Sequence, residues 1–487
     1  MDNDFFIPNY IEITGGNPTD GTINISGAKN EILGAMAACV LTDEVLTLTN
    51  VPYISDVLDM GRVLMNLGVD VQYSPKRGIL RLHADKITSN SLSKEAGKFR
   101  ASYYLWGPLL ARFMHTGEFK SLHVEIPGGC GKKEAGEGKD KQEKSSKDAR
   151  GIDYHVNLLK LVLSADIRDY GGQIDFLLPE KKIPAGGHGV TYTTLQVSHG
   201  ATFHWMLTAS VLNQLSKMYN ASCEPEIPAL LQKLNGMGAN LRGMGFTALH
   251  SRGHDGLLHG GTFRVMPDRL EAGSYACLAF ATGGKLRLNN ADANTCRPWL
   301  NFLKEMSGNK NITIDGGSIH FDFSARPKFA GRVLQCSPYP GKETDMQQIL
   351  VPPLSLATGE SYISDPVSTW RDQQLPQMRQ FGIDCESEKI EKEDMPYSIT
   401  NGLLEILVRP SQIRRADTTG SDLRGTFGII ECGAMADGLS RVDRPNNAFR
   451  GYPNLLMNLQ KLGIRVTASG DGEFLPALPM LKKQTVR

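Results

Sequence analysis

Residues 26–73 have the sequence SGAKNEILGAMAACVLTDEVLTLTNVPYISDVLDMGRVLMNLGVDVQY, and this segment sets the architecture of the chain. It contains, in order, an apolar helix, a short strand bounded by polar turns, a second helix and an LG step into another strand. The first helix, ILGAMAACVL, is apolar nearly all round, which is typical of a helix enclosed on every side. The segment therefore predicts a helix, strand, helix, strand unit whose first helix lies inside, with sheets around it.

The same order of elements recurs along the chain. Further copies begin near residues 199, 271, 345 and 422, and an interrupted copy begins at residue 100. Self-similarity of this kind indicates one supersecondary unit used repeatedly. The copies carry unequal insertions, which favours closed globular domains over an open solenoid. Three units on either side of roughly residue 266 predict two pseudo-symmetric α/β domains with a ligand cleft between them.

Length and composition narrow the class of protein. A chain of 487 residues can form two to four ordinary domains or two large ones. The formal net charge of +1 gives no electrostatic reason to expect nucleic acid or an acidic membrane as a partner. The N-terminus lacks a signal-peptide pattern and no stretch is apolar enough to span a membrane, so we expect a cytoplasmic protein. The eight cysteines have no CxxC spacing, which predicts buried thiols rather than a zinc site or disulfides.

One segment interrupts the repeats. Residues 131–148, GKKEAGEGKDKQEKSSKD, are almost entirely charged, Gly or Ser and cannot bury a core. They predict a mobile surface loop directly after Cys130, and a solvated helix with Glu/Lys pairs is the alternative.

Three residues could carry chemistry, each with a simpler explanation. Lys29 stands in SGAKN, where a strand turns into a helix and helix amides with a lysine can hold an anion, although such a lysine is often only solvated. Cys130 ends the turn IPGGC, where a thiol beside cations has a lowered pKa and can act as nucleophile or proton donor, or be incidental. Asp345, in KETDMQQ, is predicted at a helix N-cap, where a carboxylate can serve only as a cap.

A set of motifs resembles the enolpyruvyl transferase superfamily, and within it the UDP-N-acetylglucosamine 1-carboxyvinyltransferases more than the shikimate-pathway branch. The motifs are SGAKN, RAS..L.GPLLARF, PGGC, the pair Asp153 and His155, CEPEI, MPDRLEAG, TDMQ, DLR and FRGY. They occur in order and at matching spacings from about residue 13 to about residue 469, and are jointly very specific.

The resemblance implies a fold of two inside-out α/β barrel domains, each of three repeated units with helices enclosed by sheets. The first domain would comprise residues 29–266 and carry the Cys130 lid loop, and the second residues 1–28 plus 267–487. The active site would lie in the cleft between them and close by domain motion.

The resemblance also implies a reaction. The enolpyruvyl (1-carboxyvinyl) group of phosphoenolpyruvate would pass to the 3-hydroxyl of UDP-N-acetylglucosamine by addition–elimination, with release of phosphate, in peptidoglycan synthesis. Cys130 would protonate the vinyl C3 and Asp345 would accept the proton of the acceptor hydroxyl. The epoxide antibiotic fosfomycin would alkylate Cys130. No metal, cofactor, nucleic acid, membrane or obligate protein partner is implied.

The remaining site residues also follow from the resemblance. Catalytic Lys29, with Arg150 and Arg450, would hold the phosphate and carboxylate of phosphoenolpyruvate, joined by Arg371 and Arg424 as the second domain closes. Asn30 and Arg100 would contact the acceptor. The other substrate-binding positions are Asp153, Gln196, Ser198 and Val367.

The chain departs from the family pattern around the acceptor. The segment between Cys130 and Arg150 is longer by roughly fifteen residues, and RGIDYH replaces RPVDLH, so that Gly151 and Tyr154 are unusual. Gln196 stands where a lysine normally helps to bind the diphosphate. His199 and Tyr104 are further departures, the first at an apolar position and the second at a tryptophan.

These departures leave alternatives open. Loss of a charge-assisted contact to a diphosphate is worth about 1.5–3 kcal/mol, which favours a changed acceptor. One alternative is therefore a paralogue acting on another nucleotide, such as UMP in nucleoside antibiotic biosynthesis. Another is a catalytically silent ligand-binding homologue, although the catalytic set is complete in the sequence.

Overall fold

A computed structural model describes residues 5–92, 96–98, 100–126, 152–180, 189–391 and 402–481. Cys130, Arg150, Gly151 and the charged segment 131–148 lie outside the described residues. The chain divides into two compact units. Unit 1 consists of Met1–Ala28, Pro52–Ser55 and Pro267–Ala477, and unit 2 of Lys29–Val51, Asp56–Met266 and Leu478–Arg487.

Unit 1 contains three four-stranded sheets and a two-stranded ribbon among its described residues. The first sheet has the order β16 (Ile312–Asp315), β17 (Ser318–Asp322), β15 (Lys285–Asn289), β3 (Asp20–Asn24). The second has the order β18 (Val333–Gln335), β19 (Ser361–Asp365), β21 (Leu403–Val408), β20 (Cys385–Ile390). The third has the order β22 (Asp417–Thr419), β23 (Gly438–Asp443), β2 (Tyr10–Gly15), β24 (Arg465–Ala468), and β1 (Phe5–Pro8) pairs with β25 (Gly472–Leu475).

Unit 2 is built in the same way. Its first sheet has the order β14 (Gly261–Arg264), β4 (Val45–Thr49), β6 (Ile79–His83), β5 (Asp70–Ser74). The second has the order β10 (Val190–Ser198), β11 (Ser216–Ala221), β13 (Ala248–Ser251), β12 (Leu241–Arg242). The third has three strands in the order β7 (Ser121–Glu125), β9 (Gln173–Leu177), β8 (Asp166–Asp169).

The helices alternate with these strands in the predicted order. In unit 1 they are α7 (Arg269–Thr282), α8 (Arg297–Ser307), α9 (Thr344–Leu354), α10 (Leu375–Gln380), α11 (Leu423–Met435) and α12 (Leu455–Lys461). In unit 2 they are α1 (Lys29–Ala37), α2 (Ser55–Asn66), α3 (Trp106–Thr116), α4 (Asp153–Leu163), α5 (His199–Ala209) and α6 (Glu226–Gly236). The α/β class and the helix, strand, helix, strand unit are confirmed, and most units carry a further antiparallel strand, such as β6.

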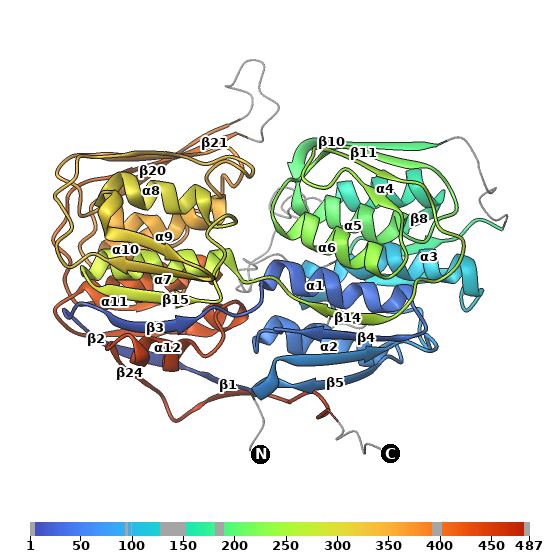
Figure 1. The fold of residues 1–487 in the computed structure, drawn as a ribbon, viewed down its shortest axis with the longest axis horizontal. Helices are drawn as coiled ribbons and strands as arrows, with labels where there is room; N and C mark the ends of the chain where they lie inside the picture. Colours follow the sequence, from blue (N-terminus) through green and yellow to red (C-terminus); the bar gives the residue numbers. More distant parts are fainter. Residues whose placement is uncertain are drawn as a thin grey trace, which may run out of the picture. The chain divides into compact units, whose positions relative to one another are not determined.

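The first helix of each repeated helix, strand, helix, strand segment is buried, as its apolar surface predicts. In unit 1, α7, α9 and α11 pack against one another, and every residue from Arg269 to Ala281 in α7 is buried. Figure 1 shows α7 and α9 between β20 and β21 on one side and β15 and β3 on the other. Close approach needs a glycine in α11, because a Cβ at Gly428 would lie 2.9 Å from the backbone oxygen of Gln348 in α9.

In unit 2, α5 packs against α1, α3, α4 and α6. Figure 1 shows α5 and α6 next to β10 and β11, with α1 on their other side and β14 and β4 beyond it. The seven cysteines that the structure describes are free, and all except the half-buried Cys223 are buried, as predicted. No helix within the described ranges is both long and apolar enough to cross a membrane.

Candidate active site

The first turns of α7, α9 and α11 bring charged side chains together in unit 1. Asp268 caps α7 by accepting hydrogen bonds from the backbone N–H groups of Leu270 at 2.8 Å and Glu271 at 2.9 Å. Asp422 caps α11 by accepting from Gly425 N at 2.9 Å. These caps satisfy donors that a helix start leaves without partners.

Helix α9 differs, and the prediction of Asp345 as an N-cap is wrong. The N-cap is Glu343, whose side chain makes no cap hydrogen bond, and Asp345 lies inside the first turn. Glu343 instead pairs with Arg269 of α7, with Arg269 Nη1 2.5 Å from Glu343 Oε1. The Asp345 carboxylate is therefore available for an ion pair, which it forms with Arg371.

Arg371 and Arg424 are held as buried cations by surrounding carboxylates. Burial opposes the charge of Arg371, but Asp345, Asp422 and Asp365 together raise its pKa above the usual value. Burial likewise opposes the charge of Arg424, whose pKa is raised by Tyr452, Asp268 and Asp345. Both guanidinium groups therefore remain positively charged in a region of low dielectric constant.

These two arginines still have donors to offer. Nε and Nη1 of Arg371 and Nη1 of Arg424 are buried and have no hydrogen-bond partner among the described residues. A buried charged donor without an acceptor is costly, and an anion such as phosphate or carboxylate would satisfy it. The helix N-termini nearby add partial positive charge. The cluster is thus suited to a small, highly charged anion.

Val367 and Arg450 lie at the edges of the same part of unit 1. Asp365 accepts from the backbone N–H of Val367 at 2.9 Å and from Thr344 Oγ1 at 2.5 Å, which ties the exposed Val367 to the start of α9. Arg450 ends the short helix η7 (Pro445–Arg450), which packs against α11, and it is half-buried.

In unit 2, Lys29 and Asn30 are the first residues of α1, as the sequence predicts. Lys29 Nζ lies 3.5 Å from Asp56 Oδ2, and only 17% of the lysine side chain is exposed. A partly buried lysine at a helix start adds its charge to the positive end of the helix dipole. The position can receive an anion.

Arg100 and His155 lie close together elsewhere in unit 2. Arg100 opens the short helix η4 (Arg100–Leu105), and its buried Nη1 has no partner within the described ranges. Its guanidinium carbon is 6.0 Å from the centre of the Tyr103 ring. The Tyr103 ring also stacks on the ring of His155, and the centroids of these two rings lie 3.8 Å apart. Asp153 is exposed at the first residue of α4.

Two of the residues that depart from the family pattern contact each other. Gln196 N donates a hydrogen bond to the Tyr154 hydroxyl at 3.1 Å, and Tyr192 Oη donates to the backbone oxygen of Tyr154 at 2.7 Å. Ser198, two residues after Gln196, caps α5 by accepting from Ala201 N at 3.2 Å. Tyr154 therefore fixes the backbone near the end of β10, at Gln196, to the start of α4.

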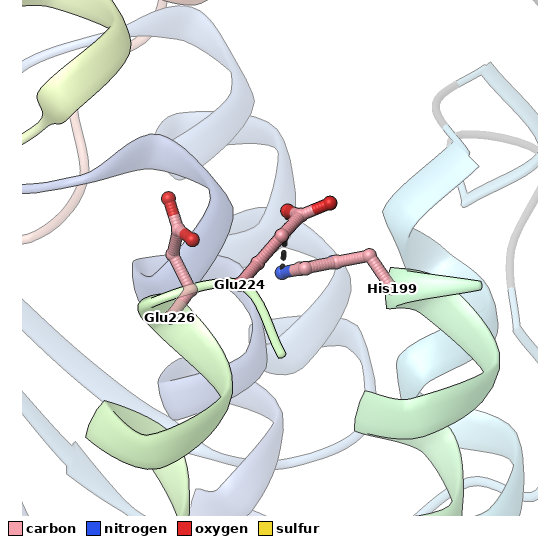
Figure 2. A group of neighbouring side chains, drawn as sticks. All are labelled: His199, Glu224 and Glu226. Atoms are coloured by element: carbon pink, nitrogen blue, oxygen red, sulfur yellow. Dashed lines mark ion pairs between the residues drawn. The ribbon is translucent and has the colours of Figure 1, made fainter. Parts of the chain in front are cut away.

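A group of possible metal ligands lies at the starts of α5 and α6. His199, Glu224 and Glu226 each offer one ligand atom, and these atoms lie within 4.8 Å of one another. Figure 2 shows the Glu224 carboxylate next to the His199 ring nitrogen, from which Oε2 is 3.8 Å away, with Glu226 to one side. Ligands of a tetrahedral metal ion lie roughly 3.3–3.8 Å apart, because metal–ligand bonds measure about 2.0–2.3 Å. The structure thus shows a close contact between His199 and Glu224, and a metal ion would require the three side chains to move closer together.

Sequence reasoning missed several residues of these clusters. Gln348 in α9 donates to both Gln374 Oε1 at 2.8 Å and Asp422 Oδ1 at 2.9 Å, and His204 in α5 contacts His155. The signal for both was a polar residue inside a helix that is otherwise apolar on all sides, because such a residue must find a buried partner.

Comparison with known proteins identifies the family. The family described as EPSP synthase (3-phosphoshikimate 1-carboxyvinyltransferase) matches residues 13–134 and 145–474. The chain belongs to this family of enolpyruvyl transferases. It is 33% identical to the UDP-N-acetylglucosamine 1-carboxyvinyltransferase of Caulobacter vibrioides (strain NA1000 / CB15N) over 468 residues, 95% of this chain and 99% of that protein. It is 31% identical to the protein of the same name from Novosphingobium aromaticivorans, over 94% of this chain and 99% of that one.

Solved structures agree on the fold. The enolpyruvyl transferase NikO from Streptomyces tendae superposes with a TM-score of 0.76 at 17% identity, covering 94% of this chain and 99% of that one. EPSP synthase from Acinetobacter baumannii gives a TM-score of 0.63 at 15% identity, covering 94% of this chain and 100% of that one. The resemblance inferred from the motifs is confirmed at the level of the family, and the protein is an enolpyruvyl transferase.

Proposed function

We propose that this enzyme transfers the 1-carboxyvinyl group of phosphoenolpyruvate to the 3-hydroxyl of UDP-N-acetylglucosamine, with release of phosphate, in peptidoglycan synthesis in the cytoplasm. The observation that carries the proposal is the cluster of Asp345, Arg371 and Arg424, with unpartnered guanidinium donors among the described residues. It occurs in a chain that is similar along 95% of its length to a transferase of that name.

The proposed architecture follows the resemblance. Each unit would be an inside-out α/β barrel, with residues 29–266 in the first domain and residues 1–28 plus 267–487 in the second. The buried first helices, with sheets beside them, support this arrangement. The active site would lie between the domains, where cations from both could meet one substrate.

The proposed reaction divides its steps between the two units. Lys29, Arg150, Arg371, Arg424 and Arg450 bind phosphoenolpyruvate, and the Cys130 thiol protonates its C3 to give an oxocarbenium-like centre at C2. The acceptor oxygen attacks C2 as Asp345 takes the hydroxyl proton. Loss of a proton from C3 then expels phosphate and restores the double bond. Ion pairing with Arg371 holds Asp345 in the charged form that a base needs.

A product assay tests the proposed acceptor. Purified protein is incubated with phosphoenolpyruvate and, separately, UDP-N-acetylglucosamine, UMP or shikimate 3-phosphate, and both phosphate release and acceptor mass are measured. Gain of a carboxyvinyl group on UDP-N-acetylglucosamine is expected. Gain on UMP or shikimate 3-phosphate alone would replace the proposed acceptor, and no gain on any would support a silent homologue.

One observation favours the second candidate, a paralogue with a different nucleotide acceptor. Gln196 replaces the expected lysine, and its backbone is held by Tyr154, another departure from the family pattern. A site without that lysine binds a diphosphate less strongly, whereas a nucleoside monophosphate would lose less.

The proposed role of Cys130 has its own test. Incubation with fosfomycin and UDP-N-acetylglucosamine is expected to add the mass of the antibiotic to the intact protein, and peptide mapping to place it on Cys130. A protein that catalyses transfer but forms no adduct would contradict a reactive thiol at this position. A Cys223→Ser variant is the matched control, because Cys223 is a half-buried thiol of unit 2 outside the proposed machinery.

A further inference from the structure

Two histidines form a buried pair in unit 2. His155, in the first turn of α4, and His204, in the middle of α5, are 3% and 0% exposed, and their Nδ1 atoms lie 3.0 Å apart. The backbone N–H of Gly107, at the start of α3, donates to His204 Nε2 at 2.9 Å. Three helices are thus joined by one chain of hydrogen bonds.

Both rings are neutral at neutral pH. Burial lowers the pKa of His204 to about 3. Burial, His204 and Arg100 together lower the pKa of His155 well below its usual value. A neutral imidazole has one N–H donor and one acceptor nitrogen, so the position of each proton follows from its neighbours.

The proton positions can be deduced in order along the chain. A backbone N–H can only donate, so Nε2 of His204 is the acceptor and its proton is on Nδ1. That Nδ1–H donates to His155 Nδ1, which leaves the proton of His155 on Nε2. No described residue accepts a hydrogen bond from this Nε2–H. The chain therefore ends in a fixed donor with no acceptor within the described part of the protein.

The surroundings indicate what this donor could bind. His155 stacks on Tyr103, which fixes the plane of its ring, and Arg100 lies close enough to affect its charge. A neutral N–H can donate to a carbonyl oxygen or to an anionic one, and Arg100, whose Nη1 has no partner among the described residues, suits an anionic oxygen. The two donors together suit a ligand that presents several oxygen atoms, at least one of them charged, as the proposed nucleotide acceptor does.

We propose that the Nε2–H of His155 donates a hydrogen bond to an oxygen atom of the nucleotide acceptor, and that His204 is the positioning residue that fixes this proton. The inference rests on the proposed function, since it concerns recognition of the same acceptor. It also gives a role to the polar His204 in a helix whose neighbouring side chains, Phe203 and Trp205, are apolar and fully buried.

The proton positions are tested without any substrate. In protein labelled with 15N-histidine, long-range 15N–1H correlation spectra distinguish the two neutral tautomers and the cation. His204 is expected to carry its proton on Nδ1 and His155 on Nε2, with signals assigned by their loss in His204→Asn and His155→Gln. A cationic ring at neutral pH, or a proton on Nε2 of His204, would overturn the inference.

A matched pair of variants tests the role of His204. Asn and Asp at this position have nearly the same size, but an ionised Asp, unlike Asn, cannot donate to His155 Nδ1. His155 is expected to keep its Nε2–H tautomer in His204→Asn and to become protonated on Nδ1 in His204→Asp. An unchanged Nδ1 signal in both variants would show that His204 does not position the proton.

A second pair tests the contact with the acceptor. The amide nitrogen of Gln can stand in for Nε2 of histidine, whereas that of Asn reaches only the Nδ1 position. His155→Asn is expected to raise KM for the acceptor about 3-fold to 10-fold, the value of one hydrogen bond, while His155→Gln stays within about 2-fold of the unmodified enzyme. The kcat and the KM for phosphoenolpyruvate should be unchanged. His115→Asn is the control, because His115 hydrogen-bonds a backbone oxygen at the far end of α3.

The outcomes separate this inference from the proposed function. Equal effects of Asn and Gln at position 155, or effects shared between kcat and the KM for phosphoenolpyruvate, would show a structural role only and overturn the inference. If the unmodified enzyme transferred the group to no nucleotide, the proposed function would fail, and with it the bond to the acceptor, while the spectra would still decide the role of His204.

Discussion

The two units hold their buried polar side chains with different chemistry. In unit 1, Asp345, Arg371 and Arg424 are charged, largely buried and compensated by other charges. In unit 2, His155 and His204 are more deeply buried and neutral, and their hydrogen bonds run in one direction. Buried charges attract a charged ligand strongly, whereas a neutral directed network selects a ligand by where its oxygen atoms lie. We therefore propose that the charged cluster of unit 1 contributes to anion binding together with Lys29 of unit 2, and that the histidine pair of unit 2 contributes to discrimination between acceptors.

The largest effect is expected from Asp345→Asn. The amide keeps the shape of the side chain but cannot accept the hydroxyl proton, so kcat should fall by about 10²–10⁴-fold. The KM for phosphoenolpyruvate should change much less, since Arg371 remains in place. Steady-state phosphate release measures both, and Asp315→Asn, at an exposed position of β16, is the matched control. A near-normal kcat would remove Asp345 from the reaction.

Arg424→Gln is expected to weaken the binding of phosphoenolpyruvate to the charged cluster of unit 1. Loss of a charge-assisted contact of about 1.5–3 kcal/mol should raise the KM for phosphoenolpyruvate by about 10-fold to 100-fold, and the KM for the acceptor far less. Arg465→Gln, an exposed arginine on β24, controls for loss of a positive charge in unit 1. If the acceptor KM rose as much as the phosphoenolpyruvate KM, the division of roles between the units would be wrong.

The buried carboxyl group of Glu271 in unit 1 should make the free energy of unfolding depend on pH. This carboxyl is fully buried and accepts from Ser26 N at 2.9 Å and Ser26 Oγ at 2.6 Å. Burial, with Asp268, raises its pKa from 4.5 to about 8, so the folded chain keeps a proton that the unfolded chain releases. The free energy of unfolding should therefore fall as pH rises from 4.5 to 8, by about 1.4 kcal/mol per pH unit from this group.

The Glu271→Gln variant isolates this contribution. A neutral amide cannot ionise, so its free energy of unfolding, measured in urea at several pH values, should lack that part of the slope. Glu305→Gln, at an exposed position of α8, should keep the original slope. Parallel slopes for the Glu271 variant and the unmodified protein would mean that this carboxyl ionises within the folded state at its ordinary pKa.

The fold was largely predictable because each repeated segment has a local pattern of apolar residues that predicts its helices. The segment ILGAMAACVL can be buried only as an enclosed helix, and it became α1 with its continuation. The further antiparallel strands, such as β6, were missed because their alternation is short and starts at a turn, here through Gly78 at a φ of +58°. Pairing of β14 with β4 and of β3 with β15 joins segments distant in sequence, and no local pattern encodes it.

The site was predictable only where the family motifs cover it. Asp345 was placed at the correct helix start, but its role as a cap was wrong, because Arg371 reaches it from a turn that local sequence cannot position. His204, a polar residue inside an apolar helix, predicted a buried partner but not which residue that partner is. Only its contacts with Gly107 and His155 reveal the direction in which its hydrogen bonds run.

The smallest expected effect belongs to Gln196→Lys, which brings a charge into the neutral region of unit 2. Strand β10 departs from regular pairing between Thr193 and Ser198, and Gln196 lies in this irregular part with its backbone held by Tyr154. The side chain is half-buried, so solvent screening reduces the gain from a new contact with a diphosphate to about 1 kcal/mol, or about 5-fold in KM.

This variant separates the two candidate acceptors. The KM for UDP-N-acetylglucosamine should fall and that for UMP should change little, because only the first carries a diphosphate. Leu195→Lys is the control, since it adds the same charge at an exposed neighbour that is 77% accessible. Equal effects of the two lysines would indicate long-range attraction. A specific gain at position 196 would show that the chain still directs this residue at the diphosphate, and that the absence of a charge here weakens the preference for a diphosphate acceptor.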